Sequence, residues 1–385
     1  MTPVPDPKPI RAFLEPAHVE LAARVAEFAT REIASLPTPA DDGAARVQAK
    51  EILARLGQAG WLRPIGAQDW RACCLIREAL GAASPLADAV FALQALGSLP
   101  LLLSGGGEAP WLAAALDGRA MGGFAMTEPD AGSDVAALGT TARRDGDAYV
   151  LQGGKTLISN AGIADYYAVF ASTDPSRGAK GISCFLVPAA TPGCRFVRPL
   201  VLSSPHPLGE IAFDGCRVPA AHRLGAEGDG YKLGLATLDR LRPTVGAAAC
   251  GMAGRALAEA LEHAATRSQF GKPLADFQLI QEKLSRMATD LTAARLLVYA
   301  AAWEKDHGAE RIPLEAGMAK AFATEAAQRI VDDAVQVLGG RGVLADHPVD
   351  RLYRSVRALR IYEGTTEIQH LVIAGHLLKG RRGGA

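Results

Sequence analysis

The spacing of the apolar residues changes twice along this 385-residue chain, and that change limits the folds it can adopt. Over about the first 120 residues the apolar residues recur at helical spacing. From about residue 121, short runs rich in β-branched and aromatic residues, each bounded by Gly, Pro or Asp, predict strands. After about residue 224 the 3.6-residue period returns. The sequence therefore predicts a helical domain over 1–120, a β domain over 121–224 and a helical domain over 225–385.

Local signals refine this division. In "AHVELAARVAEFATREI" the expected apolar stripe of the helix consists of Val19, Ala22, Ala23, Ala26 and Ile33. Gly60 and Gly339 each follow a helical run and are expected to end it. Asp145 and Gly146 stand between two extended runs, which is a hairpin signal. A further long helix is predicted by the stripe of Ile280, Leu284, Met287, Leu291 and Val298.

Composition excludes several classes of protein. Net charge is zero and the sequence pI is about 7.1, so no basic field favours a nucleic-acid partner. Six cysteines without metal-like spacing indicate reduced thiols and no metal site. The proline-rich start lacks the apolar core of a signal peptide. "AVFALQALGSLPLLL" is interrupted by Gln94, Ser98 and Pro100, and we expect it to be too short to span a bilayer. A cytoplasmic protein is predicted.

Several segments could carry chemistry, yet each has an ordinary structural explanation when taken alone. "FAMTEPDAGSDVAAL" could turn backbone N–H groups toward an anion, or could simply connect two elements. Arg267 could bind a phosphate through two hydrogen bonds, or could balance the charge of a helix C-terminus. Gly339 and Gly340 could let a ligand approach the backbone, or could only stop a helix. Glu363, in "ALRIYEGTTEIQ", read alone is a solvated surface residue.

Taken together and in this order, the motifs resemble the acyl-CoA dehydrogenase family. The resemblance rests on "MTEPDAGSD", "GGKTLISNAGIAD", "FDGCRVP", "RSQFGKPLADFQLIQ", "QVLGGRG" and "IYEGTTEIQ", and it extends from Phe124 to about Gly375. It implies a multidomain α+β fold, with an N-terminal α-helical domain, a middle β-barrel-like domain and a C-terminal four-helix-bundle-like domain. It also implies FAD as cofactor, an acyl-CoA thioester as substrate and an electron-transfer flavoprotein as electron acceptor.

In that family a base removes the α-proton of the acyl group while a hydride leaves the β-carbon for flavin N5. The resemblance gives the role of the base to Glu363. Some members place their base elsewhere, at a position that here is Leu241, which cannot abstract a proton. The family also stabilises the thioester oxygen by a hydrogen bond from the backbone N–H of the base, which is electrostatic preorganisation.

The family's binding positions match three sets of residues in this sequence. The flavin ring would contact Phe124, Met126, Thr127, Gly132, Ser133, Leu157, Ile158 and Ser159. The remainder of FAD would contact Arg267, Gln269, Phe277, Gln278, Gln336, Gly339 and Gly340, with Thr365 and Glu367. Substrate would contact Ser133, Thr173, Asp239, Arg242, Tyr362 and Gly364. Because the family draws the flavin-binding groups from different subunits, the resemblance also implies a homo-oligomer, a dimer or a tetramer.

Two departures keep alternatives open. Leu157 stands where many members have a tryptophan that shields the flavin, so an acyl-CoA oxidase-like enzyme or another flavin enzyme of the same fold stays possible. His206, between two prolines, occupies a region where the family has Lys and Arg, and a rigid exposed loop is favoured there over a catalytic histidine. A catalytically silent flavin-binding subunit is disfavoured by Glu363. The sequence does not predict the acyl group.

Overall fold

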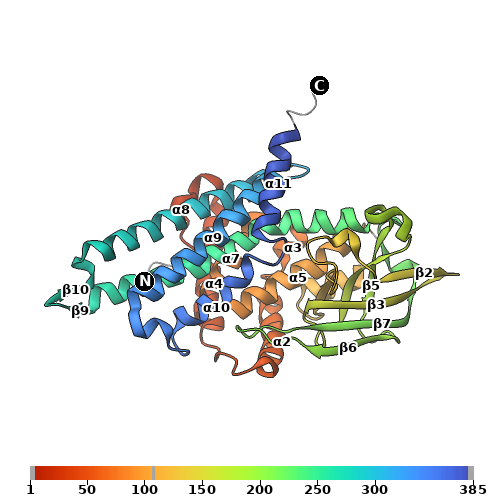
Figure 1. Cartoon of the computed structure of the whole chain (residues 1–385), viewed down its shortest axis with the longest axis horizontal. Coiled ribbons are helices and arrows are strands. Elements are labelled where there is room, and N and C mark those ends of the chain that lie inside the picture. Colours follow the sequence, from red (N-terminus) through yellow and green to blue (C-terminus); the bar gives the residue numbers. More distant parts are fainter. Residues whose placement is uncertain (1–4, 106–108, 380–385) are drawn as a thin grey trace. The chain divides into compact units, whose positions relative to one another are not determined.

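The computed structural model describes residues 5–105 and 109–379, and its contacts divide the chain into two compact units. The C-terminal unit comprises Met1–Pro37, Asp69–Asp88 and Arg242–Ala385, and the sheet unit comprises Thr38–Gln68 and Ala89–Leu241. Along the chain, helices precede the main sheet and long helices follow it, which confirms the predicted fold class (Figure 1). The domain boundaries themselves remain a prediction.

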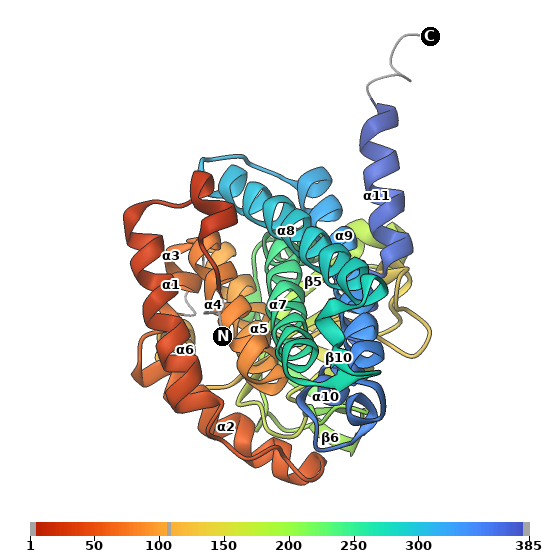
Figure 2. The same ribbon diagram turned by 90° about the vertical axis from the view of Figure 1, so that its left-hand side faces the viewer.

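The C-terminal unit is built from long helices packed side by side. Figure 2 shows α7, α8 and α9 next to one another. Glycines bring them close, since a Cβ on Gly246 of α7 would meet Val298 of α8 at 2.6 Å. Its elements are α1 (Pro16–Phe28), α4 (Trp70–Ala83), most of α7 (Gly230–Thr266), the hairpin β9 (Ser268–Gln269) and β10 (Lys272–Pro273), α8 (Gln278–Asp306), α9 (Pro313–Leu338), α10 (Pro348–Leu359) and α11 (Thr366–Lys379).

The predicted apolar face of α1 is partly wrong. Val19 and Ala23 are exposed, and the buried residues are Ala22, Val25, Ala29 and Ile33. The buried face also contains a polar residue that the apolar pattern does not reveal, since buried His18 bonds Asp69 through Nε2 at 3.1 Å. A π-helical turn spans Ala29–Ile33, and the residues at its two ends, Ala29 and Ile33, are both buried.

The sheet unit contains one mixed sheet with the strand order β6-β7-β3-β2-β4-β5-β8, and β1 pairs parallel with β4. The predicted hairpin is confirmed, since Asp145 pairs with Ala148 around Gly146, whose φ is +63°. Apolar clusters cover both faces of the sheet. The strands are β1 (Gly122–Ala125), β2 (Thr141–Asp145), β3 (Ala148–Ser159), β4 (Tyr166–Ser172), β5 (Ile182–Pro188), β6 (Cys194–Pro199), β7 (Leu208–Pro219) and β8 (Arg223–Leu224), accompanied by α2 (Asp42–Gln58), α3 (Arg63–Ala67), α6 (Ala109–Leu116) and most of α5 (Pro85–Leu103).

Helix α5 corrects the expectation about the most apolar segment. It runs for 19 residues and, among the described helices, is the one long and apolar enough to cross a membrane by length and composition. The expectation that it is too short was wrong, because Pro100 lies within the helix and does not end it. Its apolar window is 78% buried, which is typical of a core helix. Gln94 is accommodated there because it bonds Ala115 O, Ala120 O and the N–H of Gly122.

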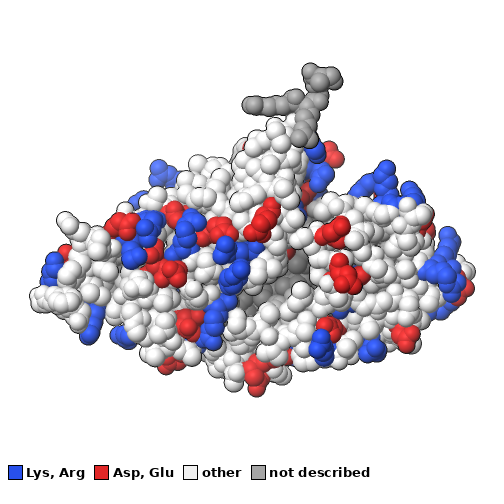
Figure 3. All heavy atoms as spheres, in the orientation of Figure 1, with Lys and Arg blue, Asp and Glu red and all other residues white. Residues whose placement is uncertain are grey.

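Charges of both signs mix on the molecular surface, and the cysteines are unpaired. On the face shown in Figure 3, Lys and Arg are interspersed with Asp and Glu, without a continuous field of one sign. All six cysteines are free thiols, and five of them are buried. Over residues 5–105 and 109–379, no group of three or more His, Cys, Asp and Glu side chains is arranged to hold a metal ion.

A buried ion pair in the C-terminal unit gives a test of this packing. Glu78 on α4 is fully buried and accepts from Arg295 at 2.7 Å and from Tyr299 at 3.0 Å, both on α8. Glu78→Ala leaves the buried Arg295 charge without its carboxylate, and we expect a loss of about 3–5 kcal/mol in the free energy of unfolding. Denaturant titration measures it. Glu282→Ala, which removes an exposed partner of Arg286, is the control and should cost below about 1 kcal/mol. Equal losses would contradict the role of burial.

Candidate active site

The centre of the candidate site is the short turn between α10 and α11, which contains Glu363. Its backbone is left-handed at Glu363 (φ +54°) and at Gly364 (φ +95°). Glycine adopts this conformation freely, but a residue with a Cβ is destabilised there by about 1–2 kcal/mol. Such a conformation persists when the surrounding structure determines it, and it is often found at functional sites.

Three buried side chains determine the conformation of this turn. Arg242 donates from Nε to the carbonyl of Glu363 at 3.1 Å, and Lys320 donates from Nζ to the carbonyl of Gly364 at 2.7 Å. Gln369 donates to both carbonyls, at 3.2 Å and 3.1 Å. Thr365 then caps α11 by accepting from the N–H of Ile368. The backbone of the turn is thus held by α7, α9 and α11 together.

The carboxylate of Glu363, unlike its backbone carbonyl, is not held by these hydrogen bonds. Its Oε2 is buried and, among the described residues, has no hydrogen-bond partner. Burial raises the pKa of Glu363, and the nearby charges of Arg77, Arg242 and Lys320 only partly oppose that shift. A carboxyl group with a raised pKa and no partner is a stronger base than a solvated one, as general-base catalysis requires.

Arg77 explains why a nearby cation does not neutralise Glu363. It lies fully buried on α4 and donates to both carboxylate oxygens of Asp88, at 2.8 Å and 2.9 Å. It also donates to the hydroxyl of Thr244 at 2.9 Å. Because Asp88 takes these hydrogen bonds, Arg77 contributes a charge near Glu363 without bonding to its carboxylate. Sequence reasoning missed Arg77, Asp88, Lys320 and Gln369, and except for Gln369 they lie far from Glu363 along the chain.

The residues expected to touch substrate have varied surroundings. Arg242 and Asp239 are buried on α7, and Tyr362 and Gly364 flank Glu363 in the turn. Leu241, at the family's alternative base position, is buried and apolar. The hydroxyl of Thr173 donates to the carbonyl of Gly181 and lies 2.9 Å from Ser183 Oγ, so it also has a structural role within the sheet unit.

In the sheet unit, a buried ion pair holds the first loop expected to bind flavin. Lys155 donates to the carbonyl of Met126 at 3.1 Å and to Glu128 at 2.7 Å. Glu128 in turn accepts from the backbone N–H groups of Gly139 and Thr140. Burial opposes ionisation of Glu128, yet Lys155 and these donors hold its pKa below the usual range.

The other loop residues differ in exposure. Phe124 packs against Phe170 with ring centroids 4.8 Å apart, and Met126 is buried. Thr127 is partly buried, and its carbonyl accepts from the N–H of Thr156. Gly132 and Ser133 are exposed. The loop therefore has a fixed base and an open tip.

At the end of β3, three consecutive residues have different exposures. Leu157 is left-handed (φ +56°) and 56% exposed, Ile158 is buried, and Ser159 is partly buried. The hydroxyl of Ser159 lies 2.8 Å from Nε2 of His206. The expectation of an exposed loop around His206 was therefore partly wrong. Residues 201–203 are exposed, but His206 turns inward, and its Nδ1 is buried.

The second set of expected flavin contacts lies at the surface of the C-terminal unit. Phe277 is partly buried, whereas Arg267, Gln269, Gln278, Gln336, Gly339 and Gly340 are exposed. Gly339 ends α9 with φ +60°, as the sequence predicts. In Figure 1 the β9–β10 hairpin, which follows Arg267, lies well away from the start of α11, where Thr365 and Glu367 are found.

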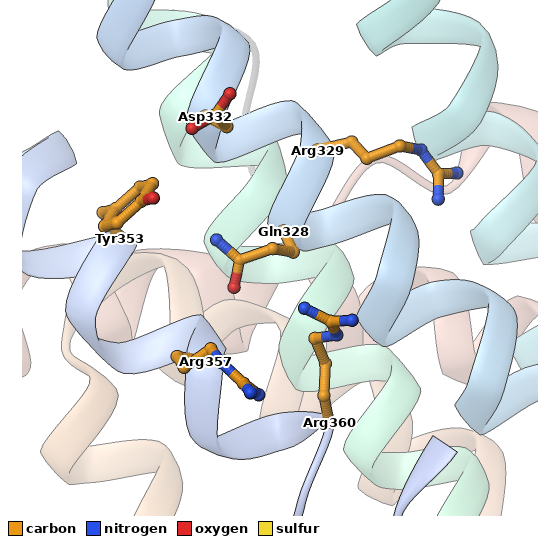
Figure 4. Close-up of a pocket in the computed structure, with 6 residues that line it drawn as sticks. All are labelled: Gln328, Arg329, Asp332, Tyr353, Arg357 and Arg360. Atoms are coloured by element: carbon orange, nitrogen blue, oxygen red, sulfur yellow. The ribbon is translucent and has the colours of Figure 1, made fainter. Parts of the chain in front are cut away.

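A separate pocket of about 350 Å³ lies between α9 and α10 (Figure 4). Two of its arginines are paired, because Arg360 donates to Glu325 at 2.7 Å and Arg329 to Asp290 at 2.9 Å. Glu363 does not line it, so this pocket is distinct from the space around the carboxylate. The lining residues are Gln328, Arg329, Asp332, Tyr353, Arg357 and Arg360.

The raised pKa of Glu363 predicts a pH-dependent change in stability. The folded chain holds the carboxyl proton of Glu363 more tightly than the unfolded chain. The free energy of unfolding therefore falls as pH rises above 4.5, the ordinary pKa of a glutamate. Glu363→Gln should therefore be more stable than the wild type at about pH 8, and the gain should shrink toward about pH 4. Thermal unfolding at several pH values measures this.

The neighbouring Glu367 provides a matched control. Hydrogen bonds from its own N–H and from Thr365 hold the pKa of Glu367 below the ordinary value, so its stabilising effect is present above that value and lost at low pH. Glu367→Gln should not gain stability at about pH 8. A Glu363→Gln variant that is less stable than the wild type at that pH would contradict the raised pKa.

Comparison with known proteins connects this geometry to a family. Residues 123–216 match the acyl-CoA dehydrogenase middle domain, and residues 228–378 match its C-terminal domain. A protein of Clostridium sporogenes named 3-(aryl)acrylate reductase is 40% identical over 379 residues, covering 95% of this chain and 100% of its own length.

Solved structures give the same result. Butyryl-CoA dehydrogenase from Megasphaera elsdenii superposes with a TM-score of 0.88 at 33% identity, covering 95% of this chain and 99% of its own. PigA with FAD and proline superposes with a TM-score of 0.86 at 28% identity, covering 96% and 99%. This chain therefore belongs to the acyl-CoA dehydrogenase family of flavoprotein oxidoreductases.

Proposed function

We propose that this enzyme dehydrogenates an acyl-CoA thioester between its α- and β-carbons, with Glu363 as the base and FAD as cofactor, to give a 2,3-enoyl-CoA. The observation that carries the proposal is the carboxylate of Glu363, whose Oε2 is buried without a partner on a turn held by three other side chains. A base held in this way is available to a substrate proton and is not consumed by an internal ion pair.

The same turn supports stabilisation of the charge that develops on the thioester oxygen. When the α-proton leaves, negative charge moves to that oxygen, and an N–H aimed at it lowers the barrier. Within residues 5–105 and 109–379, the backbone N–H of Glu363 donates to no acceptor. Because the left-handed conformation is fixed by Arg242, Lys320 and Gln369, this donor is preorganised.

The residues of the chain fit FAD at two surfaces. At the tip of the first loop, a Cβ on Gly132 would meet no atom within 4 Å, so the backbone there is open to a ligand. The same holds at Gly339 and Gly340, beside exposed Gln336. When bound, FAD supplies the acceptor of the β-hydride. Exposed Leu157 and the hydroxyl of Ser159 would lie along the ring, with Ser159 near N5, and Thr127 would bond its pyrimidine side.

A homo-oligomer follows from this proposal. Phe270 at the tip of the β9–β10 hairpin is 94% exposed, and Leu279 at the start of α8 is 80% exposed. Large apolar side chains this exposed, beside polar residues that match a cofactor site, indicate a surface that another chain covers. We propose that a second copy covers it and that each FAD is shared between the two copies.

We propose that the electrons of the reduced flavin pass to an electron-transfer flavoprotein. Exposed Leu157 covers less of a flavin edge than the tryptophan of many relatives, so an oxidase is the alternative. Oxygen consumption during turnover with acyl-CoA separates the two.

A silent flavin-binding subunit is the remaining alternative, and anaerobic bleaching of the flavin by acyl-CoA would exclude it. A protein that stays colourless with added FAD would overturn the cofactor assignment.

The proposed base is tested by Glu363→Gln. The variant should retain FAD and bind acyl-CoA, yet reduce the flavin about 10²–10⁴-fold more slowly, because the amide cannot accept the α-proton. Anaerobic bleaching of the visible absorption of the flavin measures the rate. Glu282→Gln, on the exposed face of α8, is the control and should bleach at the wild-type rate. Unchanged bleaching in Glu363→Gln would refute the assignment.

The proposed FAD contact at the second surface is tested by Arg267→Ala. Loss of a charged hydrogen bond to phosphate should weaken FAD affinity by about 10-fold or more. Equilibrium dialysis of free FAD measures it. Arg143→Ala, an exposed arginine on β2, is the control and should keep wild-type affinity. Equal affinity in the two variants would remove Arg267 from the site.

The acyl group is best identified by a panel of thioesters with straight, branched, cyclic and aryl chains, scored by anaerobic bleaching. A 3-arylpropionyl thioester belongs in the panel, because the similar C. sporogenes protein is named for an aryl acrylate, whose double bond joins the corresponding two carbons.

A further inference from the structure

The contact between Ser159 and His206 is not used by the function proposed above. Ser159 is the last residue of β3 and pairs with Leu208, the first residue of β7. This pairing brings the preceding loop back over the end of β3 and places His206 Nε2 2.8 Å from Ser159 Oγ. The contact therefore comes from the strand register and does not depend on a freely moving side chain.

The backbone around His206 is tied down on both sides of the contact. Asn160 donates its N–H to the carbonyl of Pro207 at 2.9 Å. Arg46, on α2, donates to the carbonyls of Ala161 and Leu208, each at 2.6 Å. Ala161 lies two residues after Ser159, and Leu208 lies two residues after His206. The guanidinium of Arg46 therefore joins the two segments that make the contact. The site is built by α2, β3 and β7 together.

Hydrogen-bonding capacity indicates the direction of the bond. Nδ1 of His206 is buried and has no partner among the described residues. A hydrogen on Nδ1 would be a buried N–H without an acceptor, which is rare in proteins, whereas a lone pair there costs less. The hydrogen of the neutral ring therefore belongs on Nε2, where it is donated to Ser159 Oγ.

The charges that face the ring do not change this assignment. Asp42 and Arg46 lie nearby with opposite signs, and they pair with each other at 2.6 Å. Burial lowers the pKa of His206 to about 4, with Asp42 opposing that shift and Arg46 adding to it. The ring is consequently neutral at the pH values where such an enzyme is assayed.

We propose that His206 is a positioning residue that commits the hydroxyl hydrogen of Ser159 to the reactive N5 edge of the oxidised flavin. A serine hydroxyl has a single hydrogen. Since Oγ accepts from His206, that hydrogen is free to be donated to the cofactor. This inference rests on the proposed binding of FAD with Ser159 along its ring.

The arrangement has a consequence for redox potential. The N5 edge of oxidised flavin accepts a hydrogen bond, whereas in reduced flavin it carries a hydrogen of its own. A fixed donor at Ser159 therefore stabilises the oxidised form over the reduced form. Removing the His206 donor lets the Ser159 hydrogen turn away, which should raise the midpoint potential and weaken binding of oxidised FAD.

The experiment compares His206→Gln with His206→Asn in the full-length protein. Both substituents are amides, but the nitrogen of glutamine reaches the position of Nε2 and that of asparagine does not. His206→Gln should keep wild-type FAD affinity and potential. His206→Asn should bind oxidised FAD about 3- to 10-fold more weakly and shift the two-electron potential upward by up to about 30 mV. Ser159→Ala should reproduce these changes, and adding His206→Asn to it should change nothing further.

The outcomes are distinguishable from failure of the proposed function. A wild-type protein that binds no FAD would overturn the function and the inference together. If the wild type binds FAD but His206→Asn matches it in affinity and potential, the inference is wrong and the function stands. Changes in His206→Asn that persist at full size in the Ser159→Ala background would also overturn it, because they would not act through Ser159. Thermal unfolding of the variants without FAD checks that both amides fold.

Discussion

The candidate site depends on the left-handed turn at Glu363. In this turn the backbone carbonyls are hydrogen-bonded, whereas Oε2 of the Glu363 side chain, within the described part of the chain, is not. The carbonyls of Glu363 and Gly364 receive hydrogen bonds from Arg242, Lys320 and Gln369. These bonds offset the cost of a left-handed glutamate, and Oε2 of its carboxylate stays buried without a partner among the described residues. Had the same cations bonded the carboxylate, its pKa would fall and it would be a weaker base.

Buried ion pairs fix the position of neighbouring groups within each of the two units. Arg77 is paired with Asp88, so its positive charge lies near Glu363 without binding it. In the sheet unit, Glu128 and Lys155 form another buried pair, which holds backbone groups of the first loop. Buried ion pairs contribute little net stability, because desolvation offsets their attraction. Here their importance is in fixing the position of groups that the proposed chemistry needs.

The end of β3 shows how a strand register creates a contact that neither segment suggests alone. Leu157, with its left-handed backbone, is exposed, while Ser159 is bonded to His206 from the loop before β7. Arg46 then links both segments through their carbonyls. The loop that departs most from the family pattern thus contacts a residue that the family pattern assigns to the cofactor.

The sequence by itself determined the order of helices, strands and helices, the hairpin at Gly146 and the end of α9 at Gly339, because these depend on local periodicity and on glycine's freedom to adopt positive φ. Its motifs also singled out Glu363 as the base, which stays a prediction.

Only the tertiary structure decided which face of α1 is buried, that α5 continues through Pro100, and that His206 turns inward. It alone placed Arg77, Lys320 and Gln369 around the turn that contains Glu363. The physical reason is that these outcomes depend on hydrogen bonds and charges between segments far apart in the chain. Periodicity and turn propensity report only on neighbours in sequence, so they cannot reveal such contacts.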